Sequence, residues 1–519
     1  MTDTAIVVGG GIAGLATAAL LAEDGIDVTL FEAAATVGGR AGSWERAGFR
    51  FDTGPSWYLM PEVFDHFFSL LGTTAERELD LVRLSPAYRV YAEPVDGRSD
   101  RLDVMSGRAA VRELFESREH GAGARVDAYL DSAADAYELA VSRFLYDTYA
   151  STRGLRDPEV VRRLPRLLPM LTRSLASLVA ASFGDPLLRQ ILGYPAVFLG
   201  ASPFEAPSLY HLMSHLDLDE GVLYPRGGFR EVIAAVERLA RARGVDIRTS
   251  SPVTEITVDG RTATGVRLAD GSLHTAEIVV SGADLHHTET ALLPERLRSH
   301  SKRWWRRRTP SPGALLILLG VDGPLPQLAH HTLLFSRDWK RNFADIFGRR
   351  TRIPDPASLY VCRPSATDAT VAPPDSENLF VLVPIPADPA LGRGGVDRAG
   401  DAAVEEAADR VIAQIAAWTG IPDLADRIRV RRTIMPADFA RDLNIWRGSS
   451  LGLAHTLRQS AVFRPRNASK KVDRLYFTGS SVLPGIGLPM CLISAELVVK
   501  RLHGDRSPGR LRVVSGADR

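Results

Sequence analysis

Residues 5–40 read AIVVGGGIAGLATAALLAEDGIDVTLFEAAATVGGR and decide the fold. The apolar run before the glycines predicts a strand, the Ala- and Leu-rich run after them predicts a helix, and VTLF predicts a second strand. Gly9, Gly11 and Gly14 have G-x-G-x-x-G spacing between the first strand and the helix. Strand, glycine turn, helix and strand in this order predict a βαβ unit that binds a dinucleotide.

Each part of this unit has a physical role. The first glycine permits a tight turn, the second lets the backbone approach a pyrophosphate, and the third lets helix and strand pack closely. The pyrophosphate would lie at the positive end of the helix. Glu32 ends the second strand, where its carboxylate can accept hydrogen bonds from a ribose hydroxyl. A second glycine turn, Gly38-Gly39-Arg40, offers a guanidinium to a phosphate.

Length and composition exclude several classes of protein. The chain has 519 residues, enough for two or three domains, and a net charge of +1, which gives no general attraction to nucleic acid. Its two cysteines, Cys362 and Cys491, provide no disulfide framework or metal spacing, so we predict no metal site. No signal peptide and no long apolar run stands out, which predicts a cytoplasmic protein without a transmembrane helix. No second dinucleotide fingerprint occurs, which predicts one tightly held cofactor.

Hydrophobic periodicity divides the chain into domains, some of which are formed by separate segments of the sequence. The predicted units are a nucleotide-binding domain at 1–75, 222–290 and 470–503, a substrate domain at 76–104 and 291–469, a helical insertion at 105–221, and a disordered tail at 504–519. The fold class is therefore α/β: a Rossmann-type nucleotide-binding domain with a mixed α/β substrate domain and a helical insertion.

Several blocks of the sequence match a known family. Besides the first glycine turn, they are Gly38-Gly39-Arg40, Phe51-Asp52-Thr53-Gly54-Pro55, Tyr224-Pro225-x-Gly227-Gly228 and Leu475-x-x-x-Gly479-x-x-x-x-Pro484-Gly485-x-Gly487-x-Pro489. With these blocks in the same order over nearly the whole chain, the sequence resembles bacterial-type phytoene desaturases, FAD-dependent enzymes of the amine-oxidase-like flavoprotein group. One departure is that Val482-Leu483 stands where the family commonly has Thr-His.

The resemblance implies one FAD and a set of residues around it. Pyrophosphate and ribose would be held by the first glycine turn and Glu32, phosphate by Arg40, adenine by the Val253 backbone, and the isoalloxazine would border the turn 55–57 and the start of the last helix. The implied cofactor-binding residues are Gly9, Gly11, Ala13, Gly14, Glu32, Gly39, Arg40, Pro55, Ser56, Trp57, Val253, Gly479, Ser480, Gly487, Leu488 and Met490.

The resemblance also implies the reaction and its setting. A C40 carotene such as phytoene would lose hydrogen to the flavin and move towards lycopene-type products, and oxygen or a membrane quinone would reoxidise the flavin. Because such a substrate dissolves in the bilayer, we expect peripheral contact with the cytoplasmic membrane. Two basic, apolar stretches could provide it, at 153–198 within the insertion and at 302–308, KRWWRRR.

Alternatives remain open at this stage. One is another flavin oxidase acting on amines or porphyrinogens, although Lys302 and Lys340 are the only lysines of the predicted substrate domain. Others are a redox-neutral carotene isomerase and a flavin-bearing carotenoid carrier. No catalytic base is assigned; His330, His331 and Asp284 are the candidates. The particular carotenoid, the number of desaturation steps and the oligomeric state do not follow from the sequence.

Overall fold

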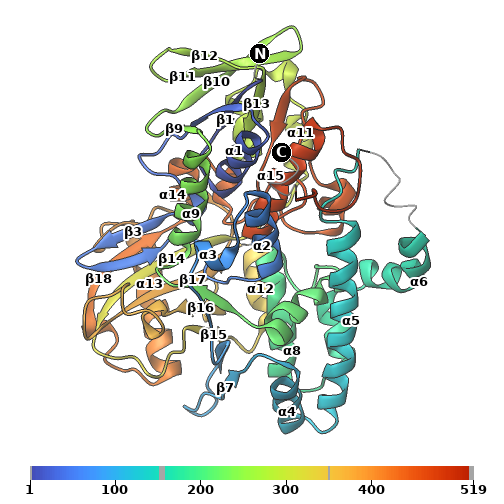
Figure 1. The fold of residues 1–519 in the computed structure, drawn as a ribbon. Helices are drawn as coiled ribbons and strands as arrows, with labels where there is room; N and C mark the ends of the chain where they lie inside the picture. The colour runs from blue at the N-terminus through green and yellow to red at the C-terminus, as the bar shows by residue number, and fades with distance from the viewer. Residues whose placement is uncertain (1–2, 151–157, 349–350, 514–519) are drawn as a thin grey trace.

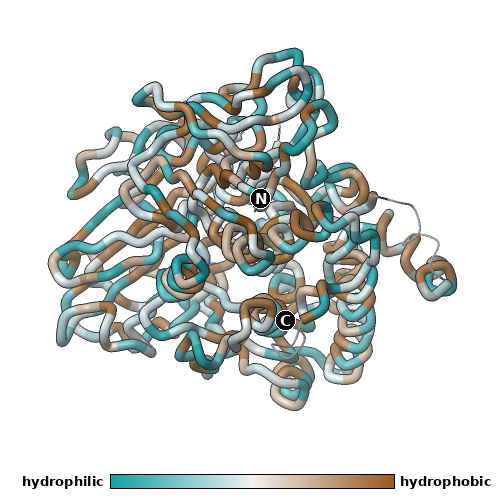
Figure 2. The backbone as a smooth tube through the Cα atoms, turned by 45° about the horizontal axis from the view of Figure 1, so that its top comes forward, coloured by the Kyte–Doolittle hydropathy of each residue, from teal (hydrophilic) through white to brown (hydrophobic). Residues whose placement is uncertain are grey.

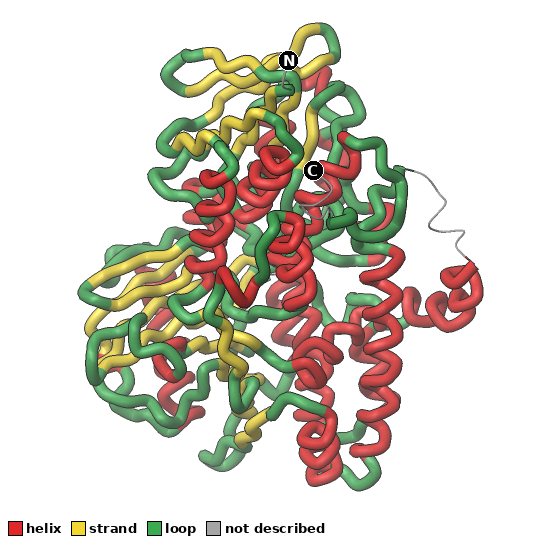
Figure 3. The backbone as a smooth tube through the Cα atoms, viewed as in Figure 1, coloured by secondary structure: helices red, strands yellow, loops and turns green. Residues whose placement is uncertain are grey.

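The computed structural model describes residues 3–150, 158–348 and 351–513. Figure 1 shows a small sheet with its helices at the top, a larger sheet at the lower left and a group of helices at the lower right. Colouring by secondary structure separates the strand-rich and helix-rich parts (Figure 3). The blue N-terminal and red C-terminal segments lie together in the upper part, so the chain leaves this part and returns to it.

The upper sheet has five parallel strands in the order β19-β13-β1-β2-β9. They are β1 Thr4–Val8, β2 Asp27–Phe31, β9 Asp246–Arg248, β13 Ile278–Ser281 and β19 Leu475–Phe477. β13 is buried along its whole length and β1 along all but its first residue, as parallel strands covered on both faces are. Since strands from distant parts of the sequence join in this one sheet, the predicted Rossmann-type α/β fold is confirmed. The exact domain boundaries stay a prediction.

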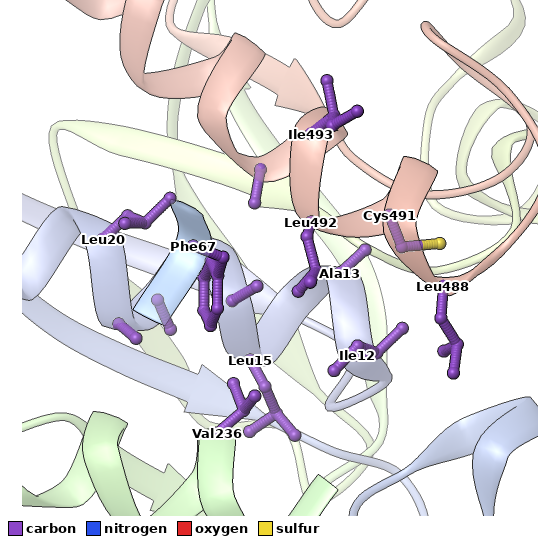
Figure 4. Close-up of a cluster of buried hydrophobic side chains, with 14 of the residues drawn as sticks. Ile12, Ala13, Leu15, Leu20, Phe67, Val236, Leu488, Cys491, Leu492 and Ile493 are labelled. Carbon is purple, nitrogen blue, oxygen red and sulfur yellow. The ribbon is translucent and has the colours of Figure 1, made fainter. Parts of the chain in front are cut away.

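Helix α1 (Ile12–Glu23) lies at the centre of this part. Its residues 12–21 are all buried, as in a helix that is covered on every side. The covering helices are α2 Pro61–Leu70, α9 Phe229–Ala242 and α15 Leu488–Leu502. Figure 4 shows where their side chains meet, with Phe67, Val236 and Leu492 around Leu15 and Ala13 of α1. The packing fixes the N-terminus of α1, which the glycine turn requires.

The lower sheet has seven strands in the order β18-β14-β17-β16-β15-β6-β7, all antiparallel to their neighbours except for β15 and β6. These strands are β6 Tyr88–Ala92, β7 Arg101–Val104, β14 Gly313–Asp322, β15 His331–Phe335, β16 Leu359–Cys362, β17 Ser376–Ile385 and β18 Ile428–Ile434. Leu315 and Ile317 of β14 pack in one cluster with α13 (Ala402–Thr419). Ala314 and Leu316 point to the opposite face, which lines a cavity.

Smaller elements complete the two sheet regions. The smaller strands are β3 Ser43–Arg46, β4 Phe49–Asp52, β5 Leu81–Arg83, β8 Leu223–Pro225, β10 Val253–Asp259, β11 Thr262–Leu268 and β12 Leu273–Thr275. The remaining helices outside the insertion are α3 Ala75–Glu78, α10 Leu285–Ala291, α11 Lys302–Arg306, α12 Trp339–Phe347 and α14 Pro436–Asp442. The β10–β11–β12 sheet packs against the upper parallel sheet, because Ile256 and Val266 share a buried cluster with Ile6.

The predicted helical insertion is helical in the structure. Its helices are α4 Arg108–Arg118, α5 Ala122–Arg143, α6 Pro158–Thr172, α7 Leu175–Ser182 and α8 Pro186–Gly193. α6 projects from the body beyond α5 (Figures 1 and 2), and hydrophobic and hydrophilic residues both occur along it. Over the ranges that the structure describes, no helix combines the length and the apolar character needed to cross a bilayer. The membrane-facing role of this region stays a prediction.

The C-terminal tail, predicted to be disordered from residue 504, is described in the structure as far as residue 513. Residues 504–513 lie against α15, because the ammonium of Lys500 is buried and needs acceptors. Its Nζ donates to the backbone oxygens of Tyr146, Ser507 and Gly509. These contacts give residues 504–513 a defined position, and residues 514–519 lie outside the described part of the chain.

Candidate functional site

A single cavity of about 1030 Å³ joins the two sheets and the helical insertion. It begins at the carboxyl ends of β1 and β2, where ligands bind in open α/β sheets. It continues past the turn 55–57 along one face of β14, β16 and β17, and it reaches α5, α6 and α12. The cavity thus connects the predicted nucleotide site with the predicted substrate and membrane regions.

All of the predicted cofactor-binding residues except Gly14 line this cavity. The lining residues among them are Gly9, Gly11, Ala13, Glu32, Gly39, Arg40, Pro55, Ser56, Trp57, Val253, Gly479, Ser480, Gly487, Leu488 and Met490. Gly14 lies one layer behind, where a Cβ would overlap the carbonyl oxygen of Gly9. It therefore sets the contact between α1 and β1, as expected for the third glycine. That these residues hold the cofactor stays a prediction.

The first glycine turn has the shape that a pyrophosphate needs. A Cβ at Gly11 would meet no atom within 4 Å, so its backbone faces open space in the cavity. Gly9 has a φ of +95°, which side chains rarely adopt. The free N–H groups of α1 begin directly after Gly11, where the helix dipole attracts an anion.

Glu32 is held in place by the backbone beside this turn. Its Oε2 accepts the Gly10 N–H at 2.6 Å, and its Oε1 accepts the Ala34 N–H at 2.8 Å. Each carboxylate oxygen keeps a lone pair, and the side chain lines the cavity. The geometry fits a carboxylate that accepts a ribose hydroxyl.

The C-terminal loop closes the same end of the cavity. Gly487 precedes α15, whose first N–H groups face the cavity as those of α1 do. Ser480 Oγ is buried and has no hydrogen-bond partner among the described residues, so a ligand could supply one. Among the described residues, the Arg40 guanidinium reaches one acceptor, the Ser450 oxygen at 3.4 Å from Nη1, which leaves most of its donors for a phosphate. Taken together, the glycine cradle, Glu32 and the unpartnered Ser480 fit FAD.

The motif at 51–55 meets the motif at 224–228 in space. The Asp52 carboxylate accepts the N–H groups of Phe229 at 2.7 Å and Arg230 at 3.3 Å and so caps α9. A Cβ at Gly228 would overlap this carboxylate, which explains the glycine. Burial raises the pKa of Asp52 to about 6, although the two backbone N–H groups act in the opposite direction.

The turn 55–57 is backed by a buried polar group. Ser56 Oγ lies 2.7 Å from the hydroxyl of Tyr360, which lies 2.7 Å from Nδ1 of His331. The indole of Trp57 stacks on the His331 ring, with centroids 4.5 Å apart and planes at 10°. Burial lowers the pKa of His331 far below its ordinary value, with the neighbouring His330 adding to the effect, so the imidazole is neutral.

The three candidate bases lie in different environments. Asp284 lines the cavity, but its Oδ1 caps α10 by accepting the N–H groups of His286 at 2.9 Å and His287 at 3.3 Å. His330 and His331 lie behind the wall formed by Trp57 and Tyr360. The structure therefore gives Asp284 a structural role, and it connects His331 to the cavity through Tyr360.

A nitrogen–sulfur cluster occurs where no metal site was predicted. Ring nitrogens of His330 and His331 and the sulfur of Cys362 lie within 4.8 Å of one another, all buried. Burial raises the pKa of the Cys362 thiol to about 12, so it is protonated and a poor metal ligand in that form. Burial lowers the pKa of His330 to about 3, and the nearby Arg363 guanidinium adds to the effect. The positive charge of Arg363 would also disfavour a metal cation at this cluster.

A second polar contact in the site, made by His455, was not predicted from the sequence. Val482 and Leu483, which replace the family's Thr-His, are buried in apolar clusters. His455 comes from a distant segment and contacts the same loop, its Nε2 accepting the Ile486 N–H at 3.2 Å. A Cβ at Gly485 would overlap the His455 ring. Nothing in the local sequence around His455 signals this contact.

Arg464 holds the same loop from beneath. Its side chain is fully buried, and it donates to the backbone oxygens of Leu453, Gln459, Ser480 and Val482. Five donors in a planar fork suit several carbonyl acceptors at once. One guanidinium thus ties the loop at 479–483 to the segment at 453–459, which lines the other side of the cavity.

Most of the remaining wall of the cavity is apolar, and the polar residues Asn342, Asp442 and Asn444 also line it. Its wall is formed by one face of β14 and β17, with Leu316 and Leu382, and by Phe198, Leu212 and Phe343 of the helical elements. Side chains of this kind suit a long hydrocarbon with few polar groups. A parallel nucleotide-binding sheet with two glycine turns, joined to a mixed sheet over such a cavity, defines a two-domain flavoprotein oxidoreductase.

The chain belongs to the flavin-containing amine oxidoreductase family, whose sequence profile matches residues 12–503. It is 42% identical over 499 residues to a carotenoid 3,4-desaturase from Haloarcula japonica, covering 96% of this chain and 98% of that protein. It is 36% identical over 503 residues to a zeta-carotene-forming phytoene desaturase from Myxococcus xanthus, covering 96% and 93%. The predicted family, the FAD cofactor and the oxidoreductase class are confirmed.

The fold is shared with solved structures. A putrescine oxidase bound to putrescine superimposes with a TM-score of 0.61 at 16% identity, covering 97% of this chain and 99% of that one. At this identity the likeness concerns the fold alone.

Proposed function

We propose that this chain is an FAD-dependent desaturase of a C40 carotene in carotenoid biosynthesis. The observation that carries the proposal is the single cavity, which joins a glycine-lined cofactor end to a long apolar end. Near full-length relatives named carotenoid 3,4-desaturase and phytoene desaturase support the same substrate class. An amine substrate would need a polar partner, whereas the wall around Leu316 and Leu382 is apolar and the Asp442 carboxylate, which also lines the cavity, is paired with Arg441.

FAD, when bound, supplies a hydride acceptor for the hydrogen that leaves the carotene. The glycine turns and Glu32 would hold the dinucleotide, and the turn 55–57 would fix the ring against the apolar wall. Leu316, Leu382 and their neighbours bind the polyene by burying its surface and exclude water from the reacting carbons. Molecular oxygen or a membrane quinone would then reoxidise the cofactor.

The test is incubation of the FAD-loaded protein with single carotenes in liposomes, with quinone or oxygen as the acceptor. We expect products that absorb at longer wavelength from phytoene or a more unsaturated carotene. A changed geometry at constant double-bond number would instead identify an isomerase. Unchanged substrate with every carotene tried would contradict the proposal.

We propose further that the protein is cytoplasmic and binds the membrane surface where α6 and the segment 457–463 both line the cavity, which we take as its mouth. Val160, Leu167 and Leu171 of α6 line the cavity, whereas Val161 and Leu168 are exposed, one heptad apart on one face. The exposed side chains of the segment are Leu457, Val462 and Phe463. An exposed apolar rim at the mouth of an apolar cavity suits a lipid surface.

The basic stretch at 302–308 adjoins this mouth. Arg308 Nη1 donates to the Arg458 oxygen at 3.2 Å, and its guanidinium stacks on the Trp304 ring at 4.3 Å. Trp305 is buried beside Trp446 and cannot reach a membrane, contrary to the expectation from the sequence. In the other stretch, residues 153–157 lie outside the described part of the chain.

Flotation with anionic phosphatidylglycerol vesicles tests the membrane proposal. Wild type should float with the vesicles, and the double variant Leu168→Ser/Phe463→Ser should bind about tenfold less because two exposed apolar side chains are lost. Leu273→Ser is the matched control, since Leu273 is equally exposed on β12, far from the cavity. Wild type that stays in the soluble fraction would contradict the proposal.

A further inference from the structure

Removal of a hydride is only half of a desaturation. When a hydride leaves one carbon, the neighbouring carbon must lose a proton for a double bond to form. The proposed function therefore needs a proton acceptor on the wall of an otherwise apolar cavity. Near the turn 55–57, which would border the isoalloxazine ring, this wall carries the hydroxyls of Ser56 and Tyr360. Both side chains line the cavity.

We infer that Tyr360 and His331 form the proton acceptor of the reaction, with the Tyr360 hydroxyl facing the substrate and the His331 imidazole behind it. This inference rests on the proposed function. The hydrogen bonds define the path, since Tyr360 Oη lies 2.7 Å from His331 Nδ1 and 2.7 Å from Ser56 Oγ. Ser56 is a positioning residue, because its hydroxyl can donate to Tyr360 Oη and so direct the tyrosine proton towards His331.

The proton balance of the step is as follows. The C–H bond next to the hydride-losing carbon breaks, and its electron pair becomes the second bond of the new C=C. The proton goes to Tyr360 Oη, and the tyrosine's own proton moves to His331 Nδ1, which leaves a neutral tyrosine and an imidazolium. No further oxidant is needed, because both electrons of the oxidation leave with the hydride.

The environment of His331 suits this role. The ring is fully buried and neutral, so one of its nitrogens is bare, and in the proposed relay this is Nδ1, which accepts the Tyr360 hydroxyl. Stacking on Trp57 fixes the plane of the ring. A buried imidazole is a weak base, but a carbon beside a developing cation is a strong acid, so a weak base is sufficient. The same low basicity makes the imidazolium release its proton readily, which resets the site.

A way out for the proton lies next to His331. Nitrogens of His330 and His331 lie within 4.8 Å of each other, and His330 Nε2 and His331 Nε2 have no hydrogen-bond partner among the described residues. His330 Nδ1 lies 2.8 Å from the hydroxyl of Thr367, which is partly exposed. The two imidazoles thus lead from the cavity wall towards the surface.

The first test is kinetic and uses Tyr360→Phe, which keeps the ring and removes the hydroxyl. We expect kcat for polyene formation to fall about 100-fold or more, while KM and the affinity for FAD stay within about twofold. Tyr91→Phe is the matched control, because Tyr91 lies in the same sheet and its hydroxyl donates to the Gln327 oxygen away from the cavity. Normal turnover by Tyr360→Phe with an active wild type would overturn the inference.

Two further readouts separate a relay from a structural role. His331→Phe keeps a ring against Trp57, and the double variant with Tyr360→Phe should be no slower than either single variant, because the two groups act as one unit. Wild type should show a solvent deuterium isotope effect in a single turnover that Tyr360→Phe lacks. Additive losses, or an isotope effect that persists, would contradict the relay.

A measurement without substrate keeps the inference separate from the proposed function. In ¹⁵N-histidine-labelled protein, the resonances lost in His331→Phe should show a neutral ring with a bare Nδ1 and a protonated Nε2. A charged ring, a proton on Nδ1, or stoichiometric metal in the purified protein would overturn the relay whatever the carotene result. Wild type that is inactive with all carotenes but has this tautomer would instead count against the proposed function alone.

Discussion

The two ends of the cavity are built in different ways. The cofactor end is backbone: glycines at two turns, the starts of α1 and α15, and one carboxylate, Glu32, held by neighbouring N–H groups. The apolar end is formed by side chains from strands and helices that are far apart in the sequence. This difference shows that a compact, charged ligand group is bound by backbone groups close together in the sequence. A hydrocarbon is instead bound by side chains that only the tertiary fold brings together.

The strongest test of this contrast is Gly14→Ala. Its Cβ would overlap the backbone oxygen of Gly9, so α1 must move away from β1. We expect a loss of about 3 kcal/mol or more in the free energy of unfolding, together with FAD-free protein. Chemical denaturation and the flavin content measure the two effects. Wild-type stability in this variant would show that the α1–β1 contact is not as close as described.

Asp52→Asn probes the junction between the two ends. The pKa of the Asp52 carboxyl is about 6 in the folded protein, compared with 3.8 when the group is fully solvated in the unfolded chain. The folded state therefore keeps this proton up to a higher pH. Its stability contribution is complete below about pH 4 and is lost as the pH rises through 6. Relative to Asp52→Asn, wild type should lose about 3 kcal/mol between about pH 3 and pH 7, of which about 2 kcal/mol is lost between pH 4 and 6.

Unfolding by urea at several pH values checks this prediction, with Asp259→Asn, at the exposed end of β10, as the control. If wild type and Asp52→Asn keep a constant difference in stability across this range, the carboxyl does not retain its proton as described.

Gly11→Ala should separate cofactor binding from folding. A Cβ at this position meets no protein atom and projects into the cavity, so the apoprotein should fold normally. The methyl group would occupy space that the pyrophosphate needs, and we expect FAD to bind about 30-fold more weakly, equivalent to about 2 kcal/mol. Fluorescence titration of the apoprotein with FAD measures the affinity. Unchanged affinity would place the pyrophosphate elsewhere.

The smallest effect is expected at the apolar end, where no single side chain dominates. Leu382→Asn places an unpaired amide in the wall, at a cost of about 1–2 kcal/mol to carotene binding, or roughly 5- to 30-fold in kcat/KM. FAD should bind as in wild type. Leu273→Asn, on the exposed surface of β12, should change neither quantity. Loss of FAD from Leu382→Asn would mean that the two ends are not separable.

The same contrast explains what the sequence could predict. The glycine turns, Glu32 and the block at 479–490 act through local chain geometry, and they were found because their spacing is visible in the sequence. Tyr360 and His455 were missed, because β-sheet pairing and loop packing bring them to the cavity from positions with no motif. His330 and His331 were noticed, but their link to the cavity depends on Tyr360 of the neighbouring strand.

The position of residues 504–513 could not be predicted for a related reason. Their polar, Arg-rich composition is typical of disorder, but a buried ammonium at Lys500 binds the backbone oxygens of this segment. That Lys500 lies on the buried face of its helix cannot be predicted until the packing of the helix is known.

The topology of the upper sheet also has a consequence for the order of events during synthesis. β19 and α15, which complete the sheet and cover α1, come several hundred residues after α1 and are synthesised long after it. Until then, the apolar surface of α1 that faces Leu492 and Ile493 has no cover. The nascent chain is therefore expected to need protection from aggregation until α15 has been synthesised, and to acquire its cofactor only after that.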